Sequence, residues 1–292
     1  MEKIPDGIHL RSNSPNLHDE GFMTDLNPYA TPESPLTPGN PTQAGLLTEP
    51  RKVPAGRGWD WIADGFGLFK LDPWIWILNS VILFVIVFVI VFVILFLLGV
   101  APFGRIASNI ALQIINPIFL GGLMLGCYAL DTGGRLKVEH LFAGFKTKAG
   151  SLAAVGGLYL LGFIVVILLM FLLGVLMGVM QSGAKLNPQE TAQLAYLGII
   201  AILIGVALTV PLVMAFWFAP ALVMFHSLGA VEAMKLSFRG CLRNIFPFII
   251  YGLAGGLLAI LAVIPLGLGL LVLGPTLIAA TYIGYKDIFL KA

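Results

Sequence analysis

The chain has few charged residues. Only 11% of its 292 residues are Asp, Glu, Lys or Arg, whereas 58% are hydrophobic and the mean hydropathy is +0.95. A water-soluble globule, in which about 25% of residues are charged, could not cover its surface with so few. Two cysteines, Cys127 and Cys241, exclude a disulfide-rich scaffold, and we expect both to be packed thiols. Residues 1–56 contain no apolar segment of the signal-peptide kind, so insertion is expected to begin at Trp74.

Residues 74–100 contain no charge and place Phe at every fourth position from Phe84 to Phe96. As a helix this run is roughly 40 Å long, more than the ~30 Å hydrocarbon core of a bilayer requires. Further apolar runs follow, and each must be helical because a helix satisfies its own backbone in lipid. We therefore predict six transmembrane helices, over residues 74–100, 107–130, 151–181, 193–225, 245–265 and 267–289.

Basic residues predict the orientation. Fifteen of the 17 Lys and Arg residues fall on one side of these spans, and only Arg105 and Lys185 fall on the other. Because Lys and Arg near spans stay cytoplasmic, we expect both termini in the cytoplasm and an even number of spans. The last two spans are separated only by Pro265 and the turn at 267–269, so a re-entrant hairpin is the alternative there.

The first 56 residues differ from the rest in composition. They are rich in Pro, Ser, Thr and Asn, most densely at 31–41, and their net charge is −3, against +5 for the remainder. Such a segment cannot bury enough apolar surface to offset its ordering entropy. We predict two domains: a disordered, partly polyproline II cytosolic tail over 1–56 and a membrane domain over 57–292.

A short motif occurs three times. In each long cytosolic segment a Phe precedes a base, and apolar residues stand three or four and seven positions earlier; the pairs are Phe69 and Lys70, Phe145 and Lys146, and Phe238 and Arg239. This spacing is typical of an amphipathic helix. We predict an all-α integral membrane protein with three repeats of one cytosolic in-plane helix plus a helix pair, the in-plane helices covering 57–72, 137–148 and 228–243. The alternative is that basic amphipathic linkers are common in any polytopic protein.

These three Phe and base pairs are the candidate lipid-interface residues. Aromatic and aliphatic faces beside Lys or Arg suit anionic lipid, although simple anchoring of the helices explains them equally well. The second span of each pair also contains a proline, which we interpret as a flexing point; these residues are Asn116 with Pro117, Pro220 and Pro275. Asn116 either lines a cavity or donates to a carbonyl that Pro117 leaves free.

Packing signals distinguish the first span from the others. Spans two to six contain pairs of small residues four apart, such as Gly252 and Gly256, which let helices approach closely in lipid. The first span has no Gly, Ala or Ser from Val81 to Leu98. We expect it at the lipid-facing rim or at a loosely packed contact with a second copy.

Residues for catalysis are absent. The spans contain no ionisable side chain at mid-membrane depth, the four His are scattered, and neither a Gly-x-Ser-x-Gly elbow nor a P-loop occurs. No metal, cofactor or nucleic-acid partner is indicated, and we predict that the protein is not an enzyme.

Four short motifs carry a resemblance. They are Gly58-Trp59-Asp60-Trp61-Ile62, Gly65-Phe66-Gly67-Leu68-Phe69-Lys70, Phe218-Ala219-Pro220-Ala221 and Tyr285-Lys286-Asp287-Ile288-Phe289. Together they resemble an uncharacterised family of proteobacterial six-span inner-membrane proteins. The architecture is also similar to the membrane region attached to some glycerophosphodiester phosphodiesterases, whose catalytic domain has no counterpart here.

The expected function follows from these features. We predict a multi-pass inner-membrane protein that organises lipids or partner proteins through its cytosolic in-plane helices, with membrane lipids and a second copy or another membrane protein as partners. The alternative is a transporter or flippase-like carrier for an apolar or amphipathic molecule. A polar cavity near Asn116 favours the carrier, and a solid apolar bundle favours the organiser.

Overall fold

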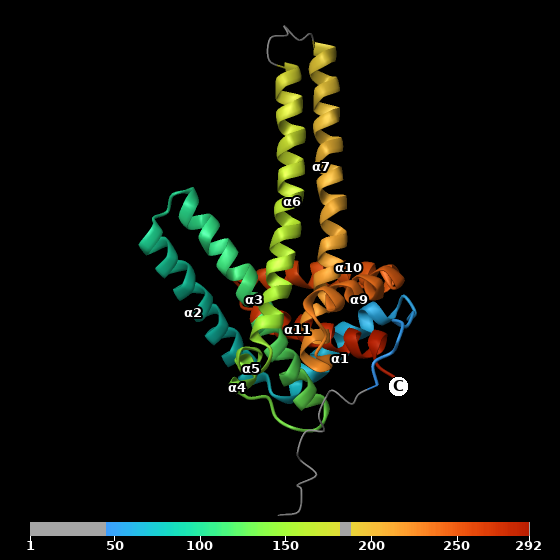
Figure 1. The fold of residues 1–292 in the computed structure, drawn as a ribbon. Coiled ribbons are helices and arrows are strands. Elements are labelled where there is room, and N and C mark those ends of the chain that lie inside the picture. The colour runs from blue at the N-terminus through green and yellow to red at the C-terminus, as the bar shows by residue number, and fades with distance from the viewer. Residues whose placement is uncertain (1–44, 182–187, 292) are drawn as a thin grey trace, which may run out of the picture. The chain divides into compact units, whose positions relative to one another are not determined.

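The computed structural model describes residues 45–181 and 188–291, and these residues form helices joined by short connections (Figure 1). Two long apolar pairs project from a base. The first pair is α2 (Pro73–Leu98) and α3 (Pro102–Asp131), and the second is α6 (Ala149–Gln181) and α7 (Pro188–Trp217). The base consists of α1 (Arg57–Leu71), α4 (Val138–Leu141), α5 (Ala143–Thr147), α8 (Ala219–His226), α9 (Ala230–Arg243), α10 (Ile245–Val263) and α11 (Leu270–Phe289).

Proline and glycine set the limits of the first pair. Pro73 begins α2 and Pro102 begins α3, where the missing N–H has no helical partner in any case. Gly99 ends α2 with a φ of 77°, a conformation that glycine adopts without strain. The uncharged run of 74–100 therefore forms one helix, and none of the residues in its most apolar window is buried. That exposure fits the predicted lipid-facing rim.

Five helices in the described residues are long and apolar enough to cross a membrane, and the predicted sixth span is not among them. The five lie within Pro73–Leu98, Pro102–Asp131, Ala149–Leu176, Tyr196–His226 and Ile245–Val263. The last helix, α11, carries Lys286 and Asp287 near its C-terminal end. Much of its surface is buried, including Tyr282, Tyr285 and Ile288. It packs inside protein instead of facing lipid, so it does not need a wholly apolar surface.

The third helix pair is also oriented differently from the other two. Whereas α6 and α7 rise side by side, α10 runs across their base (Figure 1). The pair is joined by a turn in which Leu266 and Gly267 have positive φ. The helix pair of the predicted repeat is thus formed twice as a projecting hairpin, and its third instance has another arrangement.

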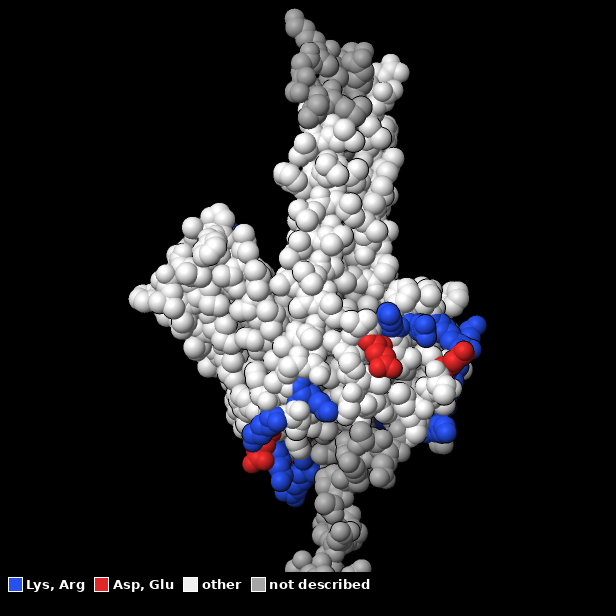
Figure 2. Space-filling view, in the orientation of Figure 1, with Lys and Arg blue, Asp and Glu red and all other residues white. Residues whose placement is uncertain are grey.

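Most charged side chains of the described residues lie in the base; Arg105, in the first turn of α3, is an exception. In Figure 2 the α6 and α7 pair is white over the part that the structure describes, and blue side chains gather over α4 and α5 and over α9. Lys185, the basic residue predicted in the loop between the third and fourth spans, lies outside the described residues.

Two of the three predicted in-plane helices form as single helices, and the middle one is broken. The helices α1 and α9 correspond to 57–72 and 228–243, but 137–148 splits into α4 and α5 at Phe142. Both pieces lie against α3. A Cβ on Gly122 would lie 2.3 Å from the His140 carbonyl oxygen, and one on Gly144 would lie 2.1 Å from that of Ile118.

The predicted tail ends earlier than residue 56. Residues 45–53 form an extended strap on the end of the chain, in which Leu46 and Leu290 make an antiparallel bridge. The N–H of Leu47 donates to the Phe289 carbonyl at 2.8 Å, and the N–H of Val53 donates to the Asn244 side chain at 2.8 Å. Composition indicated disorder for this segment, but backbone hydrogen bonds need no apolar side chains. Residues 1–44 of the predicted tail lie outside the described residues.

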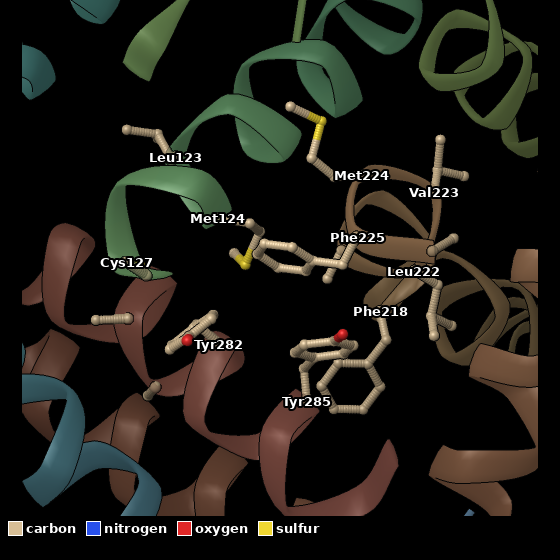
Figure 3. Close-up of a cluster of buried hydrophobic side chains, with 14 of the residues drawn as sticks. Leu123, Met124, Cys127, Phe218, Leu222, Val223, Met224, Phe225, Tyr282 and Tyr285 are labelled. Carbon is tan, nitrogen blue, oxygen red and sulfur yellow. The ribbon is translucent and has the colours of Figure 1, made fainter. Parts of the chain in front are cut away.

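The core is aromatic and joins α3, α8 and α11. In Figure 3, Phe225 of α8 lies between Met124 of α3 and the two tyrosines of α11. Its ring stacks on Tyr285 at a centroid distance of 5.3 Å and meets Tyr282 at 6.1 Å. Cys127 is fully buried at the same junction. This core lies in the base, so the two projecting pairs depend on it for their attachment.

Candidate lipid interface

A break between α7 and α8 determines where α9 lies. In a continuous helix the Phe218 N–H would donate to the Met214 carbonyl. Instead it donates to the Ser237 hydroxyl at 2.9 Å, and that hydroxyl donates to Met214 at 2.7 Å. The hydroxyl of α9 therefore replaces one helical hydrogen bond with two. The result joins α9 to the foot of α7.

Cys241 makes a second contact at the same carbonyl. Its thiol lies one helical turn after Ser237 and donates to the Met214 oxygen at 3.5 Å. Burial raises the pKa of the Cys241 thiol to about 12, and a hydrogen bond with Ser237 lowers it less. The thiol stays protonated at neutral pH, so it serves as a packed donor.

The outer face of α9 combines apolar and basic side chains. Val231 and Leu242 are each 52% exposed, and Lys235 and Arg239 are exposed beside them. Within residues 45–181 and 188–291, neither Lys235 nor Arg239 forms an ion pair. A helix with such a face lies well at the boundary between headgroups and acyl chains.

Of three cavities in the described residues, the first and the third are lined in part by α9. The first, of about 760 Å³, extends between α6, α7 and α10 and reaches Cys241. The second, of about 530 Å³, lies between α3, α7, α8, α10 and α11, and it shares Val213, Trp217, Tyr251 and Gly252 with the first. The third, of about 350 Å³, lies beneath α9 and is lined partly by Lys235 and Phe238.

Polar groups in the walls of the two larger cavities are bonded to helix carbonyls. The Thr209 hydroxyl donates to Gly205 at 2.9 Å, and the Tyr251 and Thr281 hydroxyls both donate to Leu277, at 3.2 Å and 3.0 Å. With these groups satisfied, the walls offer hydrocarbon and aromatic contact. Such cavities suit an alkyl chain better than a polar solute.

The six predicted interface residues lie on three helices and do not form one cluster. On α1, Phe69 is buried and stacks on Phe66, and the Lys70 ammonium lies 5.2 Å from the Phe66 ring centroid. On α5, Phe145 meets Phe119 edge to face at 5.0 Å, and Lys146 is exposed.

Only the third pair adjoins a cavity. On α9, Phe238 lines the third cavity and Arg239 is exposed. The motif thus places a Lys or Arg at the surface each time, but it places the Phe in three different environments. Sequence reasoning missed Ser237, whose signal is a hydroxyl on the otherwise apolar face of α9. It assigned Gly252 and Gly256 to close helix packing, whereas a Cβ on either would meet no atom within 4 Å, and Gly252 lines two cavities.

The predicted flexing prolines also differ from one another. Pro220 lies in the first turn of α8, directly after the break, as a residue that lacks an N–H should. Pro117 and Pro275 are buried inside α3 and α11, which continue through them. Asn116 lines none of the three cavities. A polar cavity beside Asn116 is therefore not part of the described structure.

Two of the four motifs behind the resemblance, 58–62 and 285–289, meet in a polar clasp. Asp287 accepts hydrogen bonds from the Trp61 indole at 2.8 Å and from the Arg57 guanidinium at 2.7 Å. Burial lowers the pKa of Arg57, but the hydrogen bond and charge of Asp287 outweigh it and raise that pKa. On the other side of α11, Asp131 accepts from the Tyr282 hydroxyl at 3.0 Å and pairs with Lys286. These carboxylates hold α1 and α3 to the end of α11.

Comparison with known proteins places the chain in a family. No family model and no solved structure matches it. Nothing found supports the similarity to the membrane region of glycerophosphodiester phosphodiesterases. The probable inner membrane protein BTH_II0599 of Burkholderia thailandensis is 30% identical over 210 residues, which cover 69% of this chain and 73% of that protein. The chain belongs to the family of this probable inner membrane protein.

Proposed function

We propose that the protein is a non-enzymatic organiser of inner-membrane lipids, which holds anionic lipid against α1, α5 and α9 through Lys70, Lys146 and Arg239. The observation that carries this proposal is the separation of most charge from the long apolar surfaces: two largely apolar hairpins rise from a base where most Lys and Arg gather (Figure 2). Bases at headgroup level attract the anionic cytoplasmic leaflet. The exposed Lys or Arg of each repeated motif fits that role.

The same proposal places both ends of the membrane domain in the cytoplasm. Leu46 pairs with Leu290, and Arg51 donates to the Ile288 and Leu290 carbonyls. A bilayer cannot separate residues in contact, so the number of crossings between them is even. The pair of α10 and α11 then crosses either twice or not at all, and the course of α10 across the base favours a re-entrant pair. The bias of Lys and Arg assigns that side to the cytoplasm.

The structural role of two acidic residues supports the proposal that the protein is not an enzyme. Asp131 and Asp287 are the carboxylates most involved with other helices, and both are engaged in the polar clasp. Their described partners are the side chains of neighbouring helices. We infer that these two carboxylates stabilise the base.

Charge reversal tests the lipid role. Replacing Lys70, Lys146 and Arg239 together by Glu removes about 1 kcal/mol of attraction per base and adds repulsion. Native mass spectrometry of protein from vesicles of equal phosphatidylglycerol and phosphatidylethanolamine should show a lower ratio of retained anionic lipid, with the spans still inserted.

The matched control replaces the preceding residues, Phe69, Phe145 and Phe238, by Ala. This variant should melt at a lower temperature through lost apolar contact, but its lipid ratio should match that of the wild type. An unchanged ratio in the charge-reversal variant would remove the support for lipid organisation.

A carrier for an apolar or amphipathic molecule is the second candidate function. The two larger cavities favour it, because they flank the α7 and α8 break, where a change in helix angle would alter both. Reconstituted protein should then accelerate the exchange of fluorescent phospholipid between vesicle leaflets. An organiser would leave that exchange at the protein-free rate.

A further inference from the structure

We propose that the first cavity holds one acyl chain of a bilayer phospholipid, so that the protein keeps a single lipid in a fixed position beside α9. This inference rests on the proposed function and names the ligand of the same interface. The walls are apolar, and their thiol and hydroxyl groups already donate to helix carbonyls. A cavity of this kind offers water few partners, and hydrocarbon is the filling that matches it.

The size of the cavity fits a chain. Its volume of about 760 Å³ lies within the range of about 300–1,000 Å³ typical of ligand sites. Its lining on α7 runs from Ile202 to Trp217, which is roughly 22 Å along a helix. One leaflet contributes about half of the ~30 Å hydrocarbon core, so an extended acyl chain has room along this wall.

Two exposed arginines of α9 adjoin, in the sequence, the residues that line one end of the cavity. Cys241 and Ile245 line that end, and Arg243 lies between them in the sequence, with Arg239 one turn earlier. Arg243 pairs with Glu49 at 3.0 Å, but the side chains are 48% and 79% exposed. Such a surface pair contributes little, so a phosphate can replace the carboxylate and accept two parallel hydrogen bonds from the guanidinium.

A glycine keeps the cavity open. Gly252 lines both larger cavities, and a Cβ added there would meet no atom within 4 Å. A leucine at this position would therefore enter the cavity without clashing with the backbone. Gly174 on α6 is an exposed helical glycine with the same free space and lines none of the three cavities. It provides a matched control.

Photocrosslinking tests the occupant. The full chain is reconstituted in phosphatidylglycerol vesicles containing a phosphatidylglycerol with a diazirine at the end of one acyl chain, and labelled peptides are identified after irradiation. We expect labelling to concentrate on 202–217 and 245–252. Gly252→Leu should reduce it at least about fivefold, a loss of about 1 kcal/mol, and Gly174→Leu should leave it unchanged.

Two results would overturn the proposal. One is labelling of Phe84 to Phe96 on α2 as strong as that of α7, which indicates annular lipid only. The other is undiminished labelling in Gly252→Leu. Should that variant fail to fold, Val206→Trp fills the same cavity from α7 and must reduce labelling likewise. Failure here leaves the anionic preference measured by charge reversal intact, so the two proposals are separable.

Discussion

At the scale of single residues, Ser237 connects the apolar hairpin to the base. Its side chain is fully buried and both accepts from Phe218 and donates to Met214. A buried N–H without a partner costs about 1–3 kcal/mol. No other side chain hydrogen bond described for the interface bridges a helix break in this way.

Removing this hydroxyl should therefore destabilise the protein. We expect Ser237→Ala to lower the free energy of unfolding by about 1–3 kcal/mol, because the Phe218 N–H loses its acceptor. Thermal unfolding in detergent would measure the change. Ser80→Ala is the control, since its hydroxyl donates only to the Trp76 carbonyl of its own helix at 2.9 Å. Equal melting temperatures for the two variants would contradict the bridging role.

At the scale of elements, α1 is held to α10 and α11 by glycine contacts. A Cβ on Gly58 would lie 2.0 Å from the Pro247 carbonyl oxygen, and one on Gly65 would lie 2.6 Å from the Ala280 nitrogen. Both contacts are with backbone, which cannot move aside as a flexible side chain can. The polar clasp at Asp287 then fixes the same helix from its polar side.

Two alanine substitutions in α1 should have opposite effects. Gly65→Ala should cost about 1–3 kcal/mol by forcing α1 away from α11. Gly67→Ala, in the same helix, meets no atom within 4 Å and should be neutral or stabilising by up to about 1 kcal/mol through helix propensity. Comparison of their melting temperatures tests whether α1 packs closely against α11. A Gly65→Ala protein as stable as the wild type would show that α1 does not pack this closely.

At the scale of the whole molecule, the strap joins the two ends of the membrane domain. Leu46 and Val53 pack against the core, and Asn244 accepts from Val53 and donates to the Arg51 carbonyl at 2.8 Å. The first and last parts of the described chain thus stabilise each other, and the base depends on both.

Truncation should separate the strap from the residues before it. We expect deletion of residues 1–40 to leave the melting temperature unchanged, and deletion of residues 1–56 to lower it. Each lost backbone hydrogen bond contributes roughly 0.5–1.5 kcal/mol, and several are removed together. Thermal unfolding of both truncated proteins checks this. Equal stability of the two would show that the strap contributes nothing.

Cysteine labelling in intact cells tests the orientation. Single cysteines replace exposed residues in two loops and at the end of the chain: Ala101, Arg135 and Lys291. We expect a membrane-impermeant maleimide to label only the cysteine at 101, because the proposed topology places the other two on the cytoplasmic side. The native thiols Cys127 and Cys241 are buried and should stay unlabelled. Labelling of 291 but not of 135 from outside would contradict an even number of crossings.

Sequence alone determined the class of this protein and the positions of most helices. Charge is too scarce for a soluble surface, and the apolar runs of α2, α3, α6 and α7 are long enough to cross a membrane, so composition and length were sufficient. The amphipathic helices α1 and α9 were also predictable, because amphipathic spacing is a local property. The chain itself therefore carries the prediction that it belongs in a membrane.

Only the tertiary structure decided the rest. The run at 267–289 was predicted as a span, but α11 packs inside protein through contacts with α1, α3 and α8 that no local pattern contains. The strap forms through backbone hydrogen bonds, which side-chain composition does not report. The cavities exist because Gly252 and Trp217, distant in sequence, face the same space. Long-range packing determines these features, and the physical reason is that each depends on which surfaces meet.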